Sequence, residues 1–253
     1  MQGEYIKMTI QQTRNTRISR RSYNSRPLDV LQAEVVKNAI AAVNEKYRLH
    51  IQLVIGNGAA FSKLSKSYGL FSGVQNYIAM IGKTDAADFL ERIGFAGEEI
   101  ILTAVGEGLG TCWVGGSFDK KACRCELDEG ESIVCLITVG EVLNSLSIKE
   151  RLIRNVMHRS SKEIDDMITT DATLPPWVMK GMEGVRTAPS AVNKQPVKFN
   201  FSKGILTASV EKPDSYQAID LGIAKYHFSL ASEAGEFPFG NGAAFSLYDR
   251  SRR

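Results

Sequence analysis

Residues 187–199 read TAPSAVNKQPVKF. They connect a helical pattern over residues 176–186 to a strand pattern over residues 197–201. Two prolines among small residues at the exit of a helix predict a rigid turn whose backbone is exposed on one side. Asn193 and Gln195 then present two amides, each of which can donate and accept hydrogen bonds. The turn favours contact with a flat ligand edged by heteroatoms, while an ordinary helix-to-strand connection stays the alternative at this point.

Length, charge and cysteine spacing limit the classes of protein to which the chain can belong. The chain has 253 residues and a formal net charge of +3, which fits one large domain or two small ones of an ordinary globular protein. No apolar run approaches the ~20 residues that cross a bilayer, and no signal-peptide core is present. The four cysteines and three histidines lack disulfide or zinc spacing. We therefore expect reduced cysteines in the cytoplasm, no metal site and no membrane partner.

The stretch from Lys7 to Arg26 is basic and almost free of acidic residues. Four interpretations are open: a transit peptide, a nucleic-acid-binding arm, a solvated face, or a phosphate site. In the last, the guanidinium groups of Arg20 and Arg21 would bind phosphate oxygens and the Ser22 hydroxyl would add a donor. A basic stripe elsewhere would favour nucleic acid, and the chain has none, so we expect no nucleic-acid partner.

Hydrophobic periodicity predicts the secondary-structure elements. One face of a helix after Pro27, carrying Leu31, Val35, Val36, Ile40 and Val43, is expected to be buried. A long helix over residues 85–109 is expected to end in a left-handed glycine and to offer Phe95, Ile100, Ile101 and Ala104 to the core. Further helices are predicted at 176–186 and 219–232, and strands at 49–55, 75–81, 132–140, 198–202, 205–210 and 243–248. The polar residues 144–170 look helical in parts and are interpreted as a surface crossover rather than a core element.

The order of these elements favours an α+β fold over a doubly wound sheet, since few crossovers alternate strand and helix. Residues 1–150 and 151–253 are expected to form two halves of one compact unit. Each half contains a helix, a strand, a long helix and another strand. This weak repeat suggests an internal pseudo-two-fold.

Three motifs together resemble those of the nitroreductase family of flavoproteins, in its compact single-chain branch. Arg20-Arg21-Ser22 resembles the family's N-terminal Arg-Arg-Ser. The segment 109–116, LGTCWVGG, resembles its Gly-Thr-Cys-Trp-Val-Gly stretch, and the segment 188–196, APSAVNKQP, resembles its Ala-Pro-Ser-x-x-Asn-x-Gln-Pro stretch. Two positions depart from the family pattern: Asn24, where a further arginine is common, and Val197, where tryptophan is usual.

The resemblance implies a nitroreductase-like α/β sandwich with bound FMN. Ordinary family members are homodimers with flavin sites between subunits. Here the Pro-Ser motif lies in the second half instead of following the Arg-Arg-Ser helix. We therefore expect the two halves of one chain to imitate two subunits, in a monomer with a pseudo-dimer core or a weak homodimer, with one flavin per chain.

The resemblance also implies the site residues. Arg20, Arg21 and Ser22 would hold the FMN phosphate, with Arg159 and Lys162 as further basic contacts. The isoalloxazine and the ribityl chain would be lined by Pro189, Ser190, Ala191, Asn193 and Gln195. The backbone of Gly115 and Gly116 would lie near flavin N5, and no side chain is expected to act as a catalyst.

The function so implied is an FMN-dependent oxidoreductase. NAD(P)H would donate a hydride to the flavin, and a small acceptor such as a nitroaromatic or a quinone would then take it, while the protein supplies position and electrostatics. A flavin-binding or flavin-storage protein with little turnover is the alternative.

Overall fold

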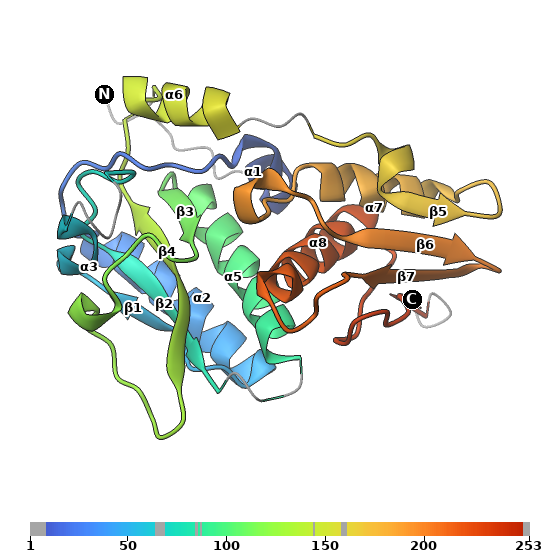
Figure 1. Ribbon diagram of the computed structural model, residues 1–253, viewed down its shortest axis with the longest axis horizontal. Coiled ribbons are helices and arrows are strands. Elements are labelled where there is room, and N and C mark those ends of the chain that lie inside the picture. The colour runs from blue at the N-terminus through green and yellow to red at the C-terminus, as the bar shows by residue number, and fades with distance from the viewer. Residues whose placement is uncertain are drawn as a thin grey trace. The chain divides into compact units, whose positions relative to one another are not determined.

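The computed structural model describes residues 9–63, 69–83, 86, 88–143, 145–157 and 161–249, without the side chains of residues 153–157. The chain forms two compact units (Figure 1). Unit 1 comprises Met1–Thr84 and Glu99–Val156, and unit 2 comprises Asp85–Glu98 and Met157–Arg253. The predicted α+β class is confirmed, whereas the division at residue 150 and the pseudo-two-fold stay predictions.

Unit 1 is built on a four-stranded sheet in the order β1-β2-β4-β3, in which every neighbouring pair is antiparallel. Its strands are β1 (Gln52–Val54), β2 (Tyr77–Gly82), β3 (Gly110–Val114) and β4 (Ser132–Gly140). All six residues of β2 are buried, as expected of a central strand that reads as a continuous apolar run. The predicted strand over 132–140 has the same bounds as β4, and the predicted strand over 49–55 is shortened to β1.

Helix α2 (Val30–Tyr47) packs next to strand β1 of unit 1. It begins with a capping box between Asp29 and Gln32. Its buried stripe consists of Ala33, Val36, Ile40, Val43 and Tyr47. The predicted burial of Leu31 is wrong, because at 100° per residue it falls on the opposite side and is 74% exposed.

The long predicted helix is α5 (Phe89–Gly106), and its four expected core residues, Phe95, Ile100, Ile101 and Ala104, are all buried. The helix ends as expected, since Gly108 has a φ of +79°. Residues 89–98 of α5 belong to unit 2 and residues 99–106 to unit 1. Unit 1 further contains the short helices α1 (Ile10–Thr16) and α3 (Ala59–Ser62), the 3-10 turn η1 (Lys120–Ala122) and all but the last residue of helix α6 (Ile148–Met157).

Unit 2 packs two helices against a three-stranded sheet. The helices are α7 (Pro176–Arg186) and α8 (Tyr216–Ser232), and the strands are β5 (Ile168–Thr170), β6 (Lys198–Ser202) and β7 (Ile205–Ser209). The helices approach closely at Gly181, where a Cβ atom would lie 2.3 Å from Phe228. Phe228 stacks on Phe199 of β6, which joins the helix pair to the sheet.

The described part of residues 144–170 contains α6 and the 3-10 turn η2 (Ile164–Asp166), in agreement with a stretch that is helical in parts. It differs from a surface crossover at β5, which pairs in parallel with β6 and brings Ile168 into the core of unit 2. The predicted C-terminal strand is reduced to β9 (Ser246–Leu247), which pairs with β8 (Gly235–Glu236). Within the described part of the chain, no helix has the length and apolar character needed to cross a membrane.

Candidate functional site

The Arg20-Arg21-Ser22 segment of unit 1 is extended and runs beside two other segments. Ser19 forms a parallel bridge with Thr111 at the start of β3, and Ser22 forms one with Ser72. The Ser72 N–H donates to Arg21 O at 2.9 Å, and the Tyr23 N–H donates to Ser72 O at 3.0 Å. The backbone of the predicted phosphate site is thus fixed on both sides within its unit.

The guanidinium group of Arg20 is buried and already bonded. Its Nε donates to Glu150 Oε1 at 3.1 Å, and its Nη2 donates to Leu143 O at 2.9 Å and to Ser145 O at 3.3 Å. The residue is 7% exposed. Arg20 therefore binds a carboxylate of the same chain, while its expected role as a phosphate contact stays a prediction.

Hydrogen-bond donors from all three residues of this segment converge on the Glu150 carboxylate. Its Oε1 also accepts the backbone N–H groups of Arg21 at 2.7 Å and Ser22 at 3.2 Å, while its Oε2 accepts the Ser147 N–H at 2.8 Å. Burial would raise the pKa of the Glu150 carboxyl, but the hydrogen bonds from Arg21, Ser147 and Arg20 outweigh it and lower the pKa to about 2. The group is an anion at physiological pH.

Sequence reasoning missed Glu150, although a signal was available. Residues 147–150 read SIKE, which is a capping-box pattern, and both bonds of the box between Ser147 and Glu150 are formed at the start of α6. Ser147 Oγ also lies 2.9 Å from Ser22 Oγ. The capping residues of α6 therefore reach the predicted phosphate-binding serine.

Gly115 and Gly116 follow β3, the edge strand of the unit 1 sheet, and both are exposed. A Cβ atom added at Gly116 would meet no described atom within 4 Å. The exposed backbone here leaves room for a planar ligand, and the expected position of these glycines near flavin N5 stays a prediction.

The loop at residues 188–196 belongs to unit 2 and has an unusual backbone. Val192, Asn193 and Gln195 have φ values of 45°, 53° and 48°. Left-handed conformations cost free energy for residues other than glycine, most of all for β-branched valine. Three of them within four positions indicate a loop held by its surroundings in one strained shape, which is common at ligand sites.

Three contacts hold this loop. The Gln195 N–H donates to Ser190 Oγ at 2.9 Å inside the loop. Lys162 contributes two bonds, from its N–H to Gln195 Oε1 at 3.0 Å and from its Nζ to Gln195 O at 2.8 Å. The structure thus brings the predicted residues Lys162 and Gln195 together, whereas Arg159 lies outside the described residues.

The third contact comes from Asp220 of α8, a residue that sequence reasoning did not assign to the site. Its Oδ1 accepts the Ala191 N–H at 2.9 Å, and the residue is 5% exposed. Burial raises the pKa of the Asp220 carboxyl to about 6, although the bond from Ala191 and the nearby charge of Lys194 act in the opposite direction. Its acidic side chain in an otherwise apolar stretch of helix is the signal that was available.

The start of the loop is anchored by a buried polar chain within unit 2. His227 Nε2 lies 3.0 Å from Glu98 Oε1, and both side chains are fully buried. His227 Nδ1 lies 3.3 Å from the hydroxyl of Thr187, the residue that ends α7. These contacts fix the point at which the chain leaves the helix and enters the strained loop.

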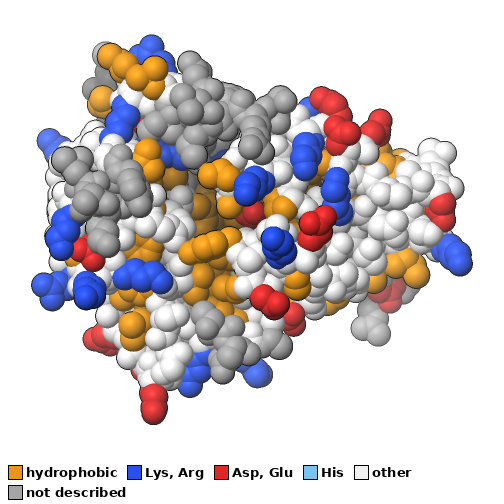
Figure 2. Space-filling model, viewed as in Figure 1, with side chains coloured by type: hydrophobic (Ala, Val, Ile, Leu, Met, Phe, Trp, Pro, Cys, Tyr) orange, Lys and Arg blue, Asp and Glu red, His pale blue; other side chains and the backbone are white. Residues whose placement is uncertain are grey.

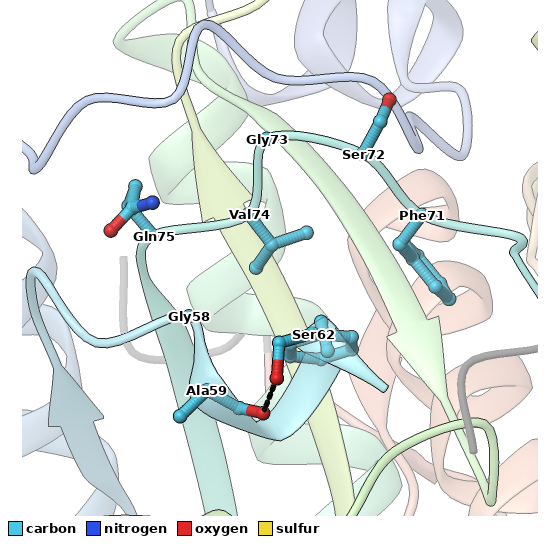
Figure 3. A pocket seen from close by; sticks show the side chains of 9 residues that line it. Gly58, Ala59, Ser62, Phe71, Ser72, Gly73, Val74 and Gln75 are labelled. Atoms are coloured by element: carbon cyan, nitrogen blue, oxygen red, sulfur yellow. Dashed lines mark hydrogen bonds between the residues drawn. The ribbon is translucent and has the colours of Figure 1, made fainter. Parts of the chain in front are cut away.

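A cavity of about 320 Å³ lies in unit 1 (Figure 3). It contains none of the residues predicted for the flavin site, and its lining is Gly58, Ala59, Phe61, Ser62, Phe71, Ser72, Gly73, Val74 and Gln75. Ser72 connects it to the Arg21–Tyr23 backbone through the bonds described above.

One group of side chains has the composition of a metal site. His50, Asp128 and Glu131 place ligand atoms within 4.8 Å of one another. The Gln52 amide is oriented by two bonds to the Glu126 backbone, so its Nε2 donates to His50 Nε2 at 2.9 Å. His50 Nδ1 then carries the proton and donates to Glu131 at 2.7 Å. This network favours a hydrogen-bonded histidine over a metal ligand at Nδ1.

Burial raises the thiol pKa of all four free cysteines, Cys112, Cys123, Cys125 and Cys135. Burial raises the pKa of the Cys135 thiol to about 12 and that of Cys123 to about 11. Both thiols are therefore neutral near pH 7, whereas a reactive cysteine needs a lowered pKa.

Comparisons with known proteins agree with this fold. A structure from Thermotoga maritima, described as a putative nitroreductase, matches with a TM-score of 0.62 and 21% identity, covering 95% of this chain and 94% of that one, which shows a shared fold. A nitroreductase family protein from Clostridium novyi NT matches with a TM-score of 0.43 and 16% identity, covering 54% of this chain and 87% of that one. A nitroreductase with bound FMN from Bacteroides fragilis matches with a TM-score of 0.43 and 14% identity, covering 56% of this chain and 95% of that one.

No match was found among curated proteins. The model of the family described as "Putative TM nitroreductase" matches residues 9–232, which include both the Arg-Arg-Ser segment and the strained loop. The chain belongs to this nitroreductase family.

Proposed function

We propose that this protein is an FMN-dependent oxidoreductase that takes electrons from NAD(P)H and reduces nitroaromatics, quinones or similar small acceptors. Family membership supports the class of reaction. The observation that supports FMN as the cofactor is the group of hydrogen-bond donors at Arg20–Ser22. There a buried guanidinium and two backbone N–H groups converge on one anionic oxygen. Such donors also suit a phosphate monoester.

Bound FMN would supply the two-electron hydride chemistry. In unit 1, Arg20, Arg21 and Ser22 would hold its phosphate, and the exposed backbone at Gly115 and Gly116 would allow the flat ring to approach. In unit 2, the loop with Pro189, Ser190, Ala191, Asn193 and Gln195 would present amides in a fixed orientation. That both sets of residues face a single flavin stays a prediction, as do a monomeric or weakly dimeric state and a cytoplasmic location.

The chain would therefore contribute the hydrogen-bond donors that bind FMN and the residues that hold those donors in place. Lys162 and Asp220 would hold the loop in its strained shape, so that its amides need no rearrangement when ligand binds.

The test is to identify the ligand that purified protein releases and then to measure turnover. Mass spectrometry is expected to show FMN, and FMN-loaded protein is expected to oxidise NADH or NADPH with a quinone or a nitroaromatic as acceptor. Release of FAD, or failure to bind any flavin after reconstitution, would contradict the proposal. Bound FMN without turnover for any donor and acceptor would instead indicate a flavin-storage protein.

A further inference from the structure

One carboxylate oxygen in unit 1 receives three converging hydrogen bonds. Oε1 of Glu150 accepts Arg20 Nε at 3.1 Å, Arg21 N–H at 2.7 Å and Ser22 N–H at 3.2 Å. Two consecutive backbone N–H groups with a guanidinium form a concave binding site for anionic oxygen. With Glu150 only 2% exposed, the segment is an anion site filled by the chain's own anion.

Helix α6 carries the buried Glu150 together with exposed apolar side chains. Ile148 and Leu152 on this helix are 74% and 60% exposed. In Figure 1, α6 lies outside the sheet of its unit. The bonds from Arg20–Ser22 to Glu150 and from Ser22 to Ser147 attach the first turn of α6 to the Arg20–Ser22 segment.

We propose that a phosphate monoester competes with Glu150 for the Arg20–Ser22 anion site, and that α6 leaves the site when the phosphate binds. The donors recognise anionic oxygen rather than a carboxylate as such. Removal of Glu150 and Ser147 would also free the Ser22 hydroxyl to donate to a third phosphate oxygen. Where the phosphate is that of FMN, this inference rests on the proposed function.

The identity of the competitor follows from charge. Glu150 is part of the same chain and so has a high effective concentration at the site, which a free carboxylate of equal charge would not overcome. A phosphate monoester carries about one further negative charge near pH 7 and one further oxygen. A dianionic phosphate is therefore the ligand class that can displace Glu150.

The matched variants are Glu150→Gln, which removes the competing charge and keeps the shape, and Glu129→Gln, which changes an exposed carboxylate outside the site. Calorimetric titrations with inorganic phosphate, FMN and riboflavin give the three affinities for each protein. We expect Glu150→Gln to bind phosphate and FMN at least about tenfold more tightly than wild type, with riboflavin unchanged. Glu129→Gln should match wild type for all three.

A second measurement uses only the wild-type protein, so it tests the proposal even if the Glu150→Gln variant does not fold. Hydrogen exchange of the α6 amides is expected to become faster when inorganic phosphate is added at constant ionic strength, while exchange in β2 and β4 stays slow. Unchanged α6 exchange, or equal phosphate affinity in wild type and Glu150→Gln, would overturn the inference and leave Glu150 a purely structural partner.

The FMN assignment and the competition by Glu150 can be refuted independently of each other. Tighter phosphate binding by Glu150→Gln in a protein that never binds flavin would support the anion site and refute the FMN assignment. Retention of FMN with identical phosphate affinities in all three proteins would support the FMN assignment and refute competition by Glu150.

Discussion

Arg20 and Glu150 lie 130 positions apart in the chain, and Arg20 Nε donates to Glu150 Oε1 at 3.1 Å. Both side chains are buried, with 9% and 2% exposed. This ion pair joins the segment that carries the family's Arg-Arg-Ser motif to the start of α6 and sets the charge of the anion site.

Arg20→Met should lower the free energy of unfolding by about 3 kcal/mol, because it leaves the Glu150 carboxylate buried without its guanidinium partner. Denaturant unfolding checks this value. Arg26→Met is the control, since Arg26 is exposed and its loss should cost no more than about 0.5 kcal/mol. The double variant Arg20→Met/Glu150→Leu should lose less than the sum of its single changes. Equal losses in Arg20→Met and Arg26→Met would refute a structural role for the pair.

Asp220 should make stability depend on pH below neutrality. Its pKa of about 6 lies above the ordinary value of 3.8, so the native protein binds more protons than the unfolded chain between these values. The contribution of Asp220 to the free energy of unfolding should therefore fall as the pH rises from about 4 to about 6. Asp220→Asn should remove this slope, whereas Asp214→Asn, at an exposed position, should keep it. Identical pH profiles for all three proteins would contradict the burial of an acid at this position.

Val192 should be replaceable by a residue that tolerates a left-handed backbone. Its φ is 45° and its side chain is 53% exposed, so Val192→Asn relieves strain and removes little apolar contact. We expect a gain of about 1 kcal/mol in the free energy of unfolding. Val30→Asn, at an 81% exposed position in α2, should show no such gain. A loss in Val192→Asn larger than that in Val30→Asn would show that the valine side chain itself stabilises the loop.

Lys162 should restrict motion in the loop. Lys162→Met removes the bond from Nζ to Gln195 O and should speed hydrogen exchange at the Gln195 N–H, which is bonded to Ser190 Oγ. Lys198→Met removes a comparable bond to Asp166 O elsewhere in unit 2 and serves as the control. Equal exchange at Gln195 in both variants would mean that Lys162 does not hold the loop.

The sequence predicts those parts of the fold that depend on local pattern. Helix α7, strand β4 and strand β6 have the predicted bounds, because their periodicity and their flanking proline and glycine residues are local signals. Strand β5 was missed because it has only three residues and its hydrogen-bonding partner β6 lies far along the chain. A short strand that depends on a distant partner leaves little trace in its own residues.

The roles expected of the site residues stay predictions. Arg20 and Gln195 lie in the family motifs, Lys162 was expected as a further phosphate contact, and the structure shows that Lys162 contacts Gln195. Glu150 and Asp220 were missed because each acts by accepting backbone hydrogen bonds from a segment distant in sequence. Local signals mark both residues, the capping-box pattern for Glu150 and the acid in an apolar helix for Asp220, but the segment that each one contacts depends on how the elements pack.

The most direct test of the central claim is the anaerobic reduction of flavin bound to the purified protein. The account predicts that NADH or NADPH bleaches the visible absorption of bound FMN and that an added quinone or nitroaromatic restores it, with one FMN per chain. Bound flavin that neither nucleotide bleaches, or a protein that takes up no FMN, would contradict it.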